Sequence, residues 1–340
     1  KPLKRTKELG VLAQKMQKLS DIYNSSSRKS DVAIYMSQQI NHLMQGERMT
    51  DNYLNSLVGA NLMMTDLHIN SDFICEKEII KGSLDKYKVL ILPCTYIISG
   101  ECGAKIKEFV KNGGHVIADY ILGEKRPGGV CYTELPGAGL KEVFGIERED
   151  VLYMAHPAMV KENSFGIEKH SFIEELILCG AKNCEDEYMD GYPIITENKF
   201  GKGKATYIAT QYFKSYEAKP SYIIRKRIAD MLAVDGILPY ASFEREDKKE
   251  PSAILTSATY DKNGLRIITV TNTDYYTIKD RIVIEAGDYE FVECDGQFEI
   301  LEENGKKVIE FELNALQSFA VYKHPSCEPN LICIHSHKSN

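Results

Sequence analysis

The chain has 340 residues, of which 43% are apolar and 27% charged, so it can form packed cores with a polar surface. The net charge is -7, and Lys and Arg are interleaved with acidic residues, which argues against nucleic acid as a partner. The longest apolar runs fall far short of the roughly 20 residues that span a bilayer, so we expect no membrane segment. Nine scattered cysteines, an odd number, favour reduced thiols and a cytoplasmic location.

The N-terminal segment begins with Lys1 and a lysine-rich helical pattern in place of a signal peptide. We therefore expect a chain cut from something longer. Apolar residues recur at intervals of three and four and predict a helix with one apolar face that ends before Asn24. These residues are Leu9, Leu12, Met16, Leu19 and Tyr23. That face packs on a neighbouring element, forms a short coiled-coil seam or belongs to an upstream domain, and the sequence does not separate these possibilities.

Strand-like and helix-like segments alternate from residue 31 onward. Strands are predicted at 32–37, 88–93 and 115–120, and helices at about 49–58 and 101–112. Repeated strand-helix-strand units of this length predict a parallel sheet with right-handed crossovers, in a flavodoxin-like α/β layer.

The pattern weakens between residues 123 and 192, where glycine and proline are frequent. Two strand-like runs, 193–196 and 204–210, then flank a turn at 200–203 and predict a hairpin. A helix predicted at about 221–232 closes the α/β layer.

The last part of the chain has a different character. Short alternating runs separated by turn signals predict a small antiparallel β-sandwich between residues 252 and 323. The runs are 253–260, 265–271, 281–285, 289–294, 307–313 and 318–322. Residues 325–340 are polar and predict a tail.

Cys94 is the residue to consider for amidotransferase-type nucleophilic catalysis, because it follows a predicted strand. That chemistry needs a thiol on a tight elbow, and Cys94 lacks the flanking glycines of one. The next strand ends in Asp119-Tyr120-Ile121, without a nucleophile. We therefore predict a buried or loop-lining thiol.

Other candidate ligand motifs are weaker. Residues 201–204 read GKGK, but a phosphate loop joins a strand to a helix, and here both flanks are predicted strands. Cys327, Cys333, His335 and His337 lack the paired spacing of a structural zinc site. We predict no catalytic, cofactor-binding or metal-binding residue and no cofactor.

The sequence shows no recognisable residue pair for glycoside hydrolysis. Glycoside hydrolysis needs two facing carboxylates, and no such pair stands out from the acids of exposed helix faces and turns. The chain has no Trp, which disfavours an independent carbohydrate-binding module, although 20 Tyr residues keep that possibility open.

Four blocks in order carry a family resemblance. They are 87–96 (YKVLILPCTY), 106–117 (IKEFVKNGGHVI), 140–146 (LKEVFGI) and 198–210, with the core FGKGKATY. In this order they resemble the trimerisation domain of family 42 β-galactosidases, whose fold is similar to class I amidotransferases.

The resemblance implies a domain plan. Residues 1–29 would be the last helix of a catalytic (β/α)8 barrel and its linker, 30–236 the trimerisation domain, 237–325 a terminal β-sandwich and 326–340 a tail. The catalytic glutamates of the family belong to barrel strands outside this sequence, so no catalytic residue is carried over. The implied partners are further copies of the chain in a homotrimer and the missing barrel, with a β-galactoside bound only through the parent enzyme. We expect the fragment itself to be inactive.

Two alternatives remain open. A free-standing sensor domain would bind a small molecule at the carboxyl ends of the strands, near residues 93–96 and 119–123. A phosphorylase parent would share the accessory architecture and use phosphate as a co-substrate.

Overall fold

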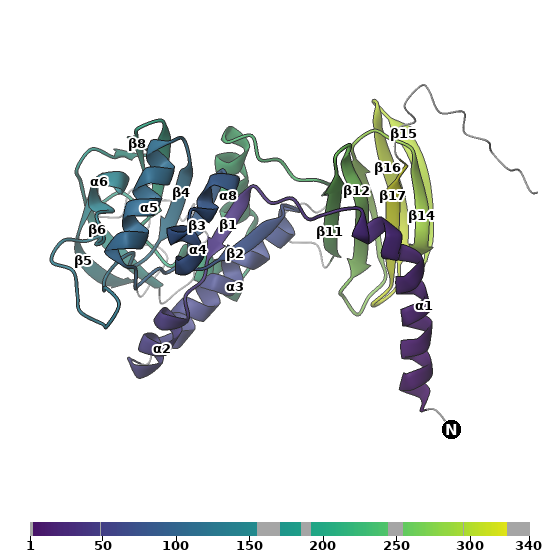
Figure 1. The fold of residues 1–340 in the computed structure, drawn as a ribbon, viewed down its shortest axis with the longest axis horizontal. Coiled ribbons are helices and arrows are strands. Elements are labelled where there is room, and N and C mark those ends of the chain that lie inside the picture. The colour runs from purple at the N-terminus through teal and green to yellow at the C-terminus, as the bar shows by residue number, and fades with distance from the viewer. Residues whose placement is uncertain are drawn as a thin grey trace, which may run out of the picture. The chain divides into compact units, whose positions relative to one another are not determined.

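The computed structural model describes residues 3–47, 49–154, 171–184, 192–243, 254–294 and 296–324. These residues form two compact units (Figure 1). The first is an α/β unit that contains residues 30–239. The second is a β-rich unit that contains residues 3–29 and the described residues from 240 onward. None of the described helices is both long and apolar enough to cross a membrane.

A seven-stranded mixed sheet forms the centre of the α/β unit, in the order β2-β1-β3-β4-β9-β8-β7. The parallel strands are β1 (Val32–Tyr35), β2 (Ser71–Ile74), β3 (Val89–Leu92), β4 (His115–Asp119) and β9 (Gly203–Ile208). Antiparallel pairing adds β8 (Ile195–Phe200) and β7 (Lys182–Asn183). All residues of β1, β3 and β4 are buried, because helices cover both faces of the sheet (Figure 1).

Two apolar cores lie on the two faces of this sheet. One contains residues of α2 (Gln38–Gly46), α4 (Glu76–Ile80), α5 (Gly100–Lys111) and α6 (Lys141–Phe144). The other contains residues of α3 (Thr50–Asp66), α7 (Tyr212–Ala218) and α8 (Tyr222–Val234). A short 3₁₀ helix, Ser83–Lys86, precedes β3. Helix α3 packs closely on α7, since a Cβ added to Gly59 would lie 1.9 Å from the Phe213 carbonyl oxygen.

The α/β architecture with a parallel sheet is confirmed, with some differences in its elements. Helix α3 extends to Asp66, beyond the predicted end at residue 58, and α7 was not predicted. The region without a clear pattern contains α6 and an antiparallel pair, β5 (Ile146–Met154) and β6 (Ser171–Leu178). The predicted hairpin turn is present between β8 and β9, where Phe200 pairs with Gly203.

The second unit contains two four-stranded antiparallel sheets around one core. One sheet has the order β10 (Ser242–Phe243), β13 (Ile278–Ile284), β16 (Lys306–Leu313), β15 (Gln297–Glu303). The other has the order β11 (Ile254–Asp261), β12 (Gly264–Asn272), β17 (Ser318–Lys323), β14 (Tyr289–Cys294). Ile268, Ile309 and Phe319 are among the buried core residues. The predicted antiparallel strands are confirmed, and β10 and β15 are additional.

Helix α1 (Lys4–Asn24) belongs to this second unit. After the helix, Ser27 and Tyr260 exchange two backbone hydrogen bonds of 2.8 and 2.7 Å. Leu9, Leu12 and Met16 are each more than half exposed, so this part of the predicted apolar face is not covered in the described structure. The predicted origin of residues 1–29 in a barrel stays a prediction.

Candidate functional site

The carboxyl edge of the parallel sheet is the place where α/β folds of this kind hold ligands and nucleophiles. Cys94 lies there, two residues after the end of β3, and its φ of 41° falls in the left-handed region. The backbone therefore makes a tight turn at Cys94 even without flanking glycines, which the sequence did not indicate. The residue is fully buried.

Asp119, the last residue of β4, holds this turn in place. Its carboxylate accepts hydrogen bonds from the Cys94 amide at 2.7 Å and from the Phe213 amide at 3.1 Å. Phe213 is in the first turn of α7, so one buried side chain ties the end of β3 to the start of a helix. Burial raises the pKa of Asp119 from 3.8 to about 7, although the amide donors oppose this shift.

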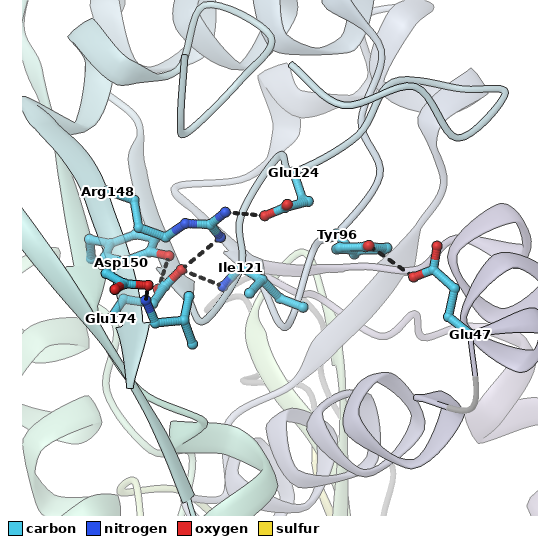
Figure 2. A network of polar contacts seen from close by, with 9 residues as sticks. Glu47, Tyr96, Ile121, Glu124, Arg148, Asp150 and Glu174 are labelled. Carbon is cyan, nitrogen blue, oxygen red and sulfur yellow. Dashed lines mark hydrogen bonds and ion pairs between the residues drawn. The ribbon is translucent and has the colours of Figure 1, made fainter. Parts of the chain in front are cut away.

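A second buried acid, Glu174 of β6, lies in a polar network at the same edge (Figure 2). It accepts hydrogen bonds from Arg148 Nη1 at 3.1 Å, from the Ile121 amide at 3.1 Å and from the Tyr207 hydroxyl at 2.5 Å. The other end of the Arg148 guanidinium binds Glu124. Burial raises the pKa of Glu174, while the charge of Arg148 opposes the shift.

A smaller group lies on the loops nearby. Glu47 accepts a hydrogen bond of 2.9 Å from the Tyr96 hydroxyl and pairs with Lys125, whose ammonium is 5.1 Å from the centre of the Tyr96 ring (Figure 2 shows Glu47 and Tyr96). Residues 93–98 and 119–123 are all buried. These are the positions where a sensor domain would bind its ligand, and that alternative stays a prediction.

The surroundings of Cys94 do not activate a thiol. Burial, followed by the negative charges of Asp119 and Glu174, raises the pKa of the thiol well above its ordinary value. The hydrogen bond that lowers it comes from Ser56, not from a histidine. These observations support the interpretation of Cys94 as a buried structural thiol, and the absence of catalytic residues stays a prediction.

A cluster at the opposite, amino edge of the sheet was not found from the sequence. His115 begins β4, and its ring nitrogens lie 2.6 Å from Asp235 Oδ2 and 2.8 Å from the Thr206 hydroxyl. Lys204 Nζ is 3.3 Å from the other oxygen of Asp235. Burial lowers the pKa of His115. Burial raises the pKa of Asp235, but hydrogen bonds and charge from His115 and Lys204 outweigh it and hold the pKa low.

Two further candidate ligand motifs were considered in the sequence, residues 201–204 and the Cys and His residues near the C-terminus. Residues 201 and 202 form the turn between β8 and β9, so no helix begins at the GKGK sequence. Cys327, Cys333, His335 and His337 lie outside the described residues. Within the described ranges, no group of three or more His, Cys, Asp and Glu residues is arranged to hold a metal ion.

The fold thus defines a chain with an α/β domain and a β-sandwich, and Asp119, Glu174 and His115 at the edges of the parallel sheet are each hydrogen-bonded within the α/β unit. Residues 61–219, which include most of the α/β domain, match the sequence model of the β-galactosidase trimerisation domain. Beta-galactosidase BgaA from Planococcus sp. (strain 'SOS Orange') is 28% identical over 219 residues, covering 60% of this chain and 32% of that protein. Beta-galactosidase Pbg from Clostridium perfringens is 26% identical over 283 residues, covering 77% of this chain and 40% of that protein.

Solved structures share the fold. The beta-galactosidase from Bacillus circulans sp. alkalophilus has a TM-score of 0.67 at 19% identity and covers 94% of this chain and 45% of its own. A catalytic mutant of Gan42B, a GH42 beta-galactosidase from G. stearothermophilus, has a TM-score of 0.69 at 21% identity and covers 94% of this chain and 44% of its own.

Residues 61–219 therefore match a β-galactosidase trimerisation domain, and the chain is similar to family 42 β-galactosidases. The resemblance inferred from the four sequence blocks is confirmed. The chain spans less than half the length of these relatives.

Proposed function

We propose that this chain is the oligomerisation and accessory region of a β-galactosidase whose parent hydrolyses terminal β-galactosides in the cytoplasm. The observation that carries the proposal is the match of residues 61–219 to the trimerisation domain. This stretch runs from within α3 to the end of α7 and includes every strand of the seven-stranded sheet except β1. The central α/β layer, similar to that of class I amidotransferases, would then serve assembly and not amide chemistry.

The buried polar groups are consistent with this role. Asp119, Glu174 and Arg148 are satisfied within the α/β unit itself and hold loops and helix ends in place. Loops and helix ends held in this way would keep a subunit interface in one fixed shape. The partners would be two further copies of the chain, packed through heterologous surfaces around a three-fold axis.

Helix α1 would make a second contact, with the catalytic barrel of the parent enzyme. Its exposed residues Leu9, Leu12 and Met16 form an apolar stripe that would be covered by the (β/α)8 barrel of the parent enzyme. The β-galactoside would bind in that barrel, and this chain would contribute no catalytic group.

Light scattering during size-exclusion chromatography tests the assembly role. We expect a molar mass three times that of the chain. A monomer at every concentration tested would contradict autonomous assembly and would mean that the barrel supplies part of the interface.

An activity assay tests the accessory role separately. The purified chain should release no nitrophenol from nitrophenyl β-galactosides, while a full-length family 42 enzyme in the same assay serves as the positive control. Turnover that co-purifies with the chain would contradict the proposal.

A further inference from the structure

Two loops at one end of the β-sandwich expose large side chains. The first, residues 273–277, joins β12 to β13, and the second, residues 314–317, joins β16 to β17. Tyr275 is 86% exposed, Tyr276 75% and Leu316 70%. Large apolar side chains that are exposed together in one patch mark a ligand or partner site, whereas single exposed ones are ordinary.

A buried asparagine ties the two loops together. The Asn272 side chain is fully buried, and its amide donates to the carbonyl oxygens of Tyr276 at 2.7 Å and of Leu313 and Asn314 at 3.0 Å. Its side-chain oxygen accepts a hydrogen bond from the Asp274 amide at 2.8 Å. The tyrosines are therefore carried by backbone that is already ordered, so a ligand that stacks on them would order little further chain.

Further contacts stiffen the second loop. The Thr277 hydroxyl donates to the side-chain oxygen of Asn314 at 2.8 Å. The backbone amide of Asn272 donates to the backbone carbonyl of Gln317 at 2.9 Å. Leu316 has a φ of 61°, a conformation that is costly for a residue with a side chain and is kept only where the surroundings impose it. Such strained positions occur preferentially at functional sites.

The chemistry of these loops is neutral and amphiphilic. Asp274 is their only charged residue, and the exposed neighbours of the tyrosines are Thr273, Thr277 and Asn314. The outer sheet between β13 and β16 differs, because it carries ion pairs such as Arg281 with Glu310. A neutral pyranose presents the matching pattern, since its C–H face stacks on an aromatic ring and its hydroxyls bind amide and hydroxyl groups.

We propose that Tyr275 and Tyr276 form a binding platform for a neutral, pyranose-based oligosaccharide, with hydroxyl and amide groups of Thr277 and Asn314 beside them. The platform is argued from the loops alone, while the choice of β-galactosides as first ligands rests on the proposed function. The absence of Trp disfavoured such a module in the sequence, and the structure supplies two exposed tyrosines in its place.

Saturation-transfer NMR of the full chain with lactose, a β-galactotetraose, cellotetraose and mannotetraose tests the proposal. We expect at least one of these sugars to bind with a dissociation constant on the order of 1 mM. Replacing both Tyr275→Ala and Tyr276→Ala should weaken binding about tenfold. Because both side chains are exposed, these variants should fold normally, which circular dichroism would verify.

Two controls locate the effect. The double variant Tyr275→Phe with Tyr276→Phe keeps both rings and should bind within about twofold of the wild type. Tyr222→Ala removes a tyrosine in the α/β unit and should leave binding unchanged.

Three results would overturn the proposal. These are no binding of any of the four sugars at about 10 mM, binding that the double alanine variant retains, and loss of self-association in that variant without sugar binding. The last result would assign the loops to a protein contact. Light scattering of the same samples reports assembly independently, so a failed platform and a failed assembly role can be told apart.

Discussion

The two ends of strand β4 bury titratable groups that respond to pH in opposite directions. At the carboxyl end, burial raises the pKa of Asp119 to about 7, so the folded state favours the protonated acid. At the amino end, burial lowers the pKa of His115, so the folded state favours the neutral ring. Burial thus disfavours the charged form at both ends, and the sign of the charge decides whether acid or base destabilises the fold.

The partners also differ between the two ends. Asp119 is held by backbone amides, whereas His115 is held by the side chains of Asp235 and Thr206. The acid end therefore fixes loops and the start of α7, and the histidine end joins β4 to β9 and to the end of α8. Substitutions at each end separate these contributions.

The largest effect should come from Glu174 at the carboxyl edge. Glu174→Ala removes the carboxylate that pairs with Arg148 and accepts the hydrogen bond of the Tyr207 hydroxyl. Because this breaks a buried ion pair, the free energy of unfolding should fall by about 4 kcal/mol. Urea denaturation followed by circular dichroism measures the change.

Glu108→Ala, in an exposed pair with Lys105 on α5, is the matched control and should leave the midpoint unchanged. A loss below about 1 kcal/mol for Glu174→Ala would show that the buried network adds no more than a surface pair.

Asp119→Asn should change the pH dependence of stability. The folded-state pKa is raised, so the folded protein binds more protons than the unfolded one between pH 3.8 and about 7, and wild-type stability should fall as pH rises through this window. The Asn side chain cannot titrate, so the fall in the free energy of unfolding across this window should be about 3 kcal/mol smaller in the variant. Urea unfolding at a series of pH values gives both profiles, and parallel profiles would contradict the raised pKa.

His115→Gln should change the pH dependence of stability in the opposite direction. The folded-state pKa lies below 6.5, so the unfolded protein binds more protons and stability should fall as pH drops below 6.5. Removing the imidazole should reduce this loss. His42→Gln, at an exposed position on α2, is the control for the loss of a histidine side chain. A His115→Gln profile that stays parallel to wild type below pH 6.5 would place the titration elsewhere.

The smallest effect concerns the Cys94 thiol. Alkylation of the native chain with iodoacetamide, followed by peptide mass spectrometry, should modify the exposed residues Cys131, Cys179 and Cys184 and spare Cys94. Cys94 should react only after unfolding, because the thiol is buried and its pKa is raised. Rapid modification of Cys94 in the native protein would reopen the possibility of a reactive nucleophile.

Part of this architecture could be read from local patterns. The buried run of β3 and the helix that follows it were predicted to within one or two residues, because a strand covered on both faces is a continuous apolar run. The alternation in β11 and β13 likewise predicted the sandwich, since every second residue faces its core. Helix α7 was missed, because its start depends on Asp119, which is 94 positions away from Phe213.

The polar networks could not be predicted in this way. Arg148 and Glu174 lie 26 positions apart in a region without periodicity, and His115 meets Asp235 across 120 positions. Sequence by itself determined the apolar strands, the order of the two units and the resemblance to family 42 β-galactosidases. Only the tertiary structure decided which charged residues are buried and paired, because the cost of burying a charge is offset by partners that folding brings together from distant parts of the chain.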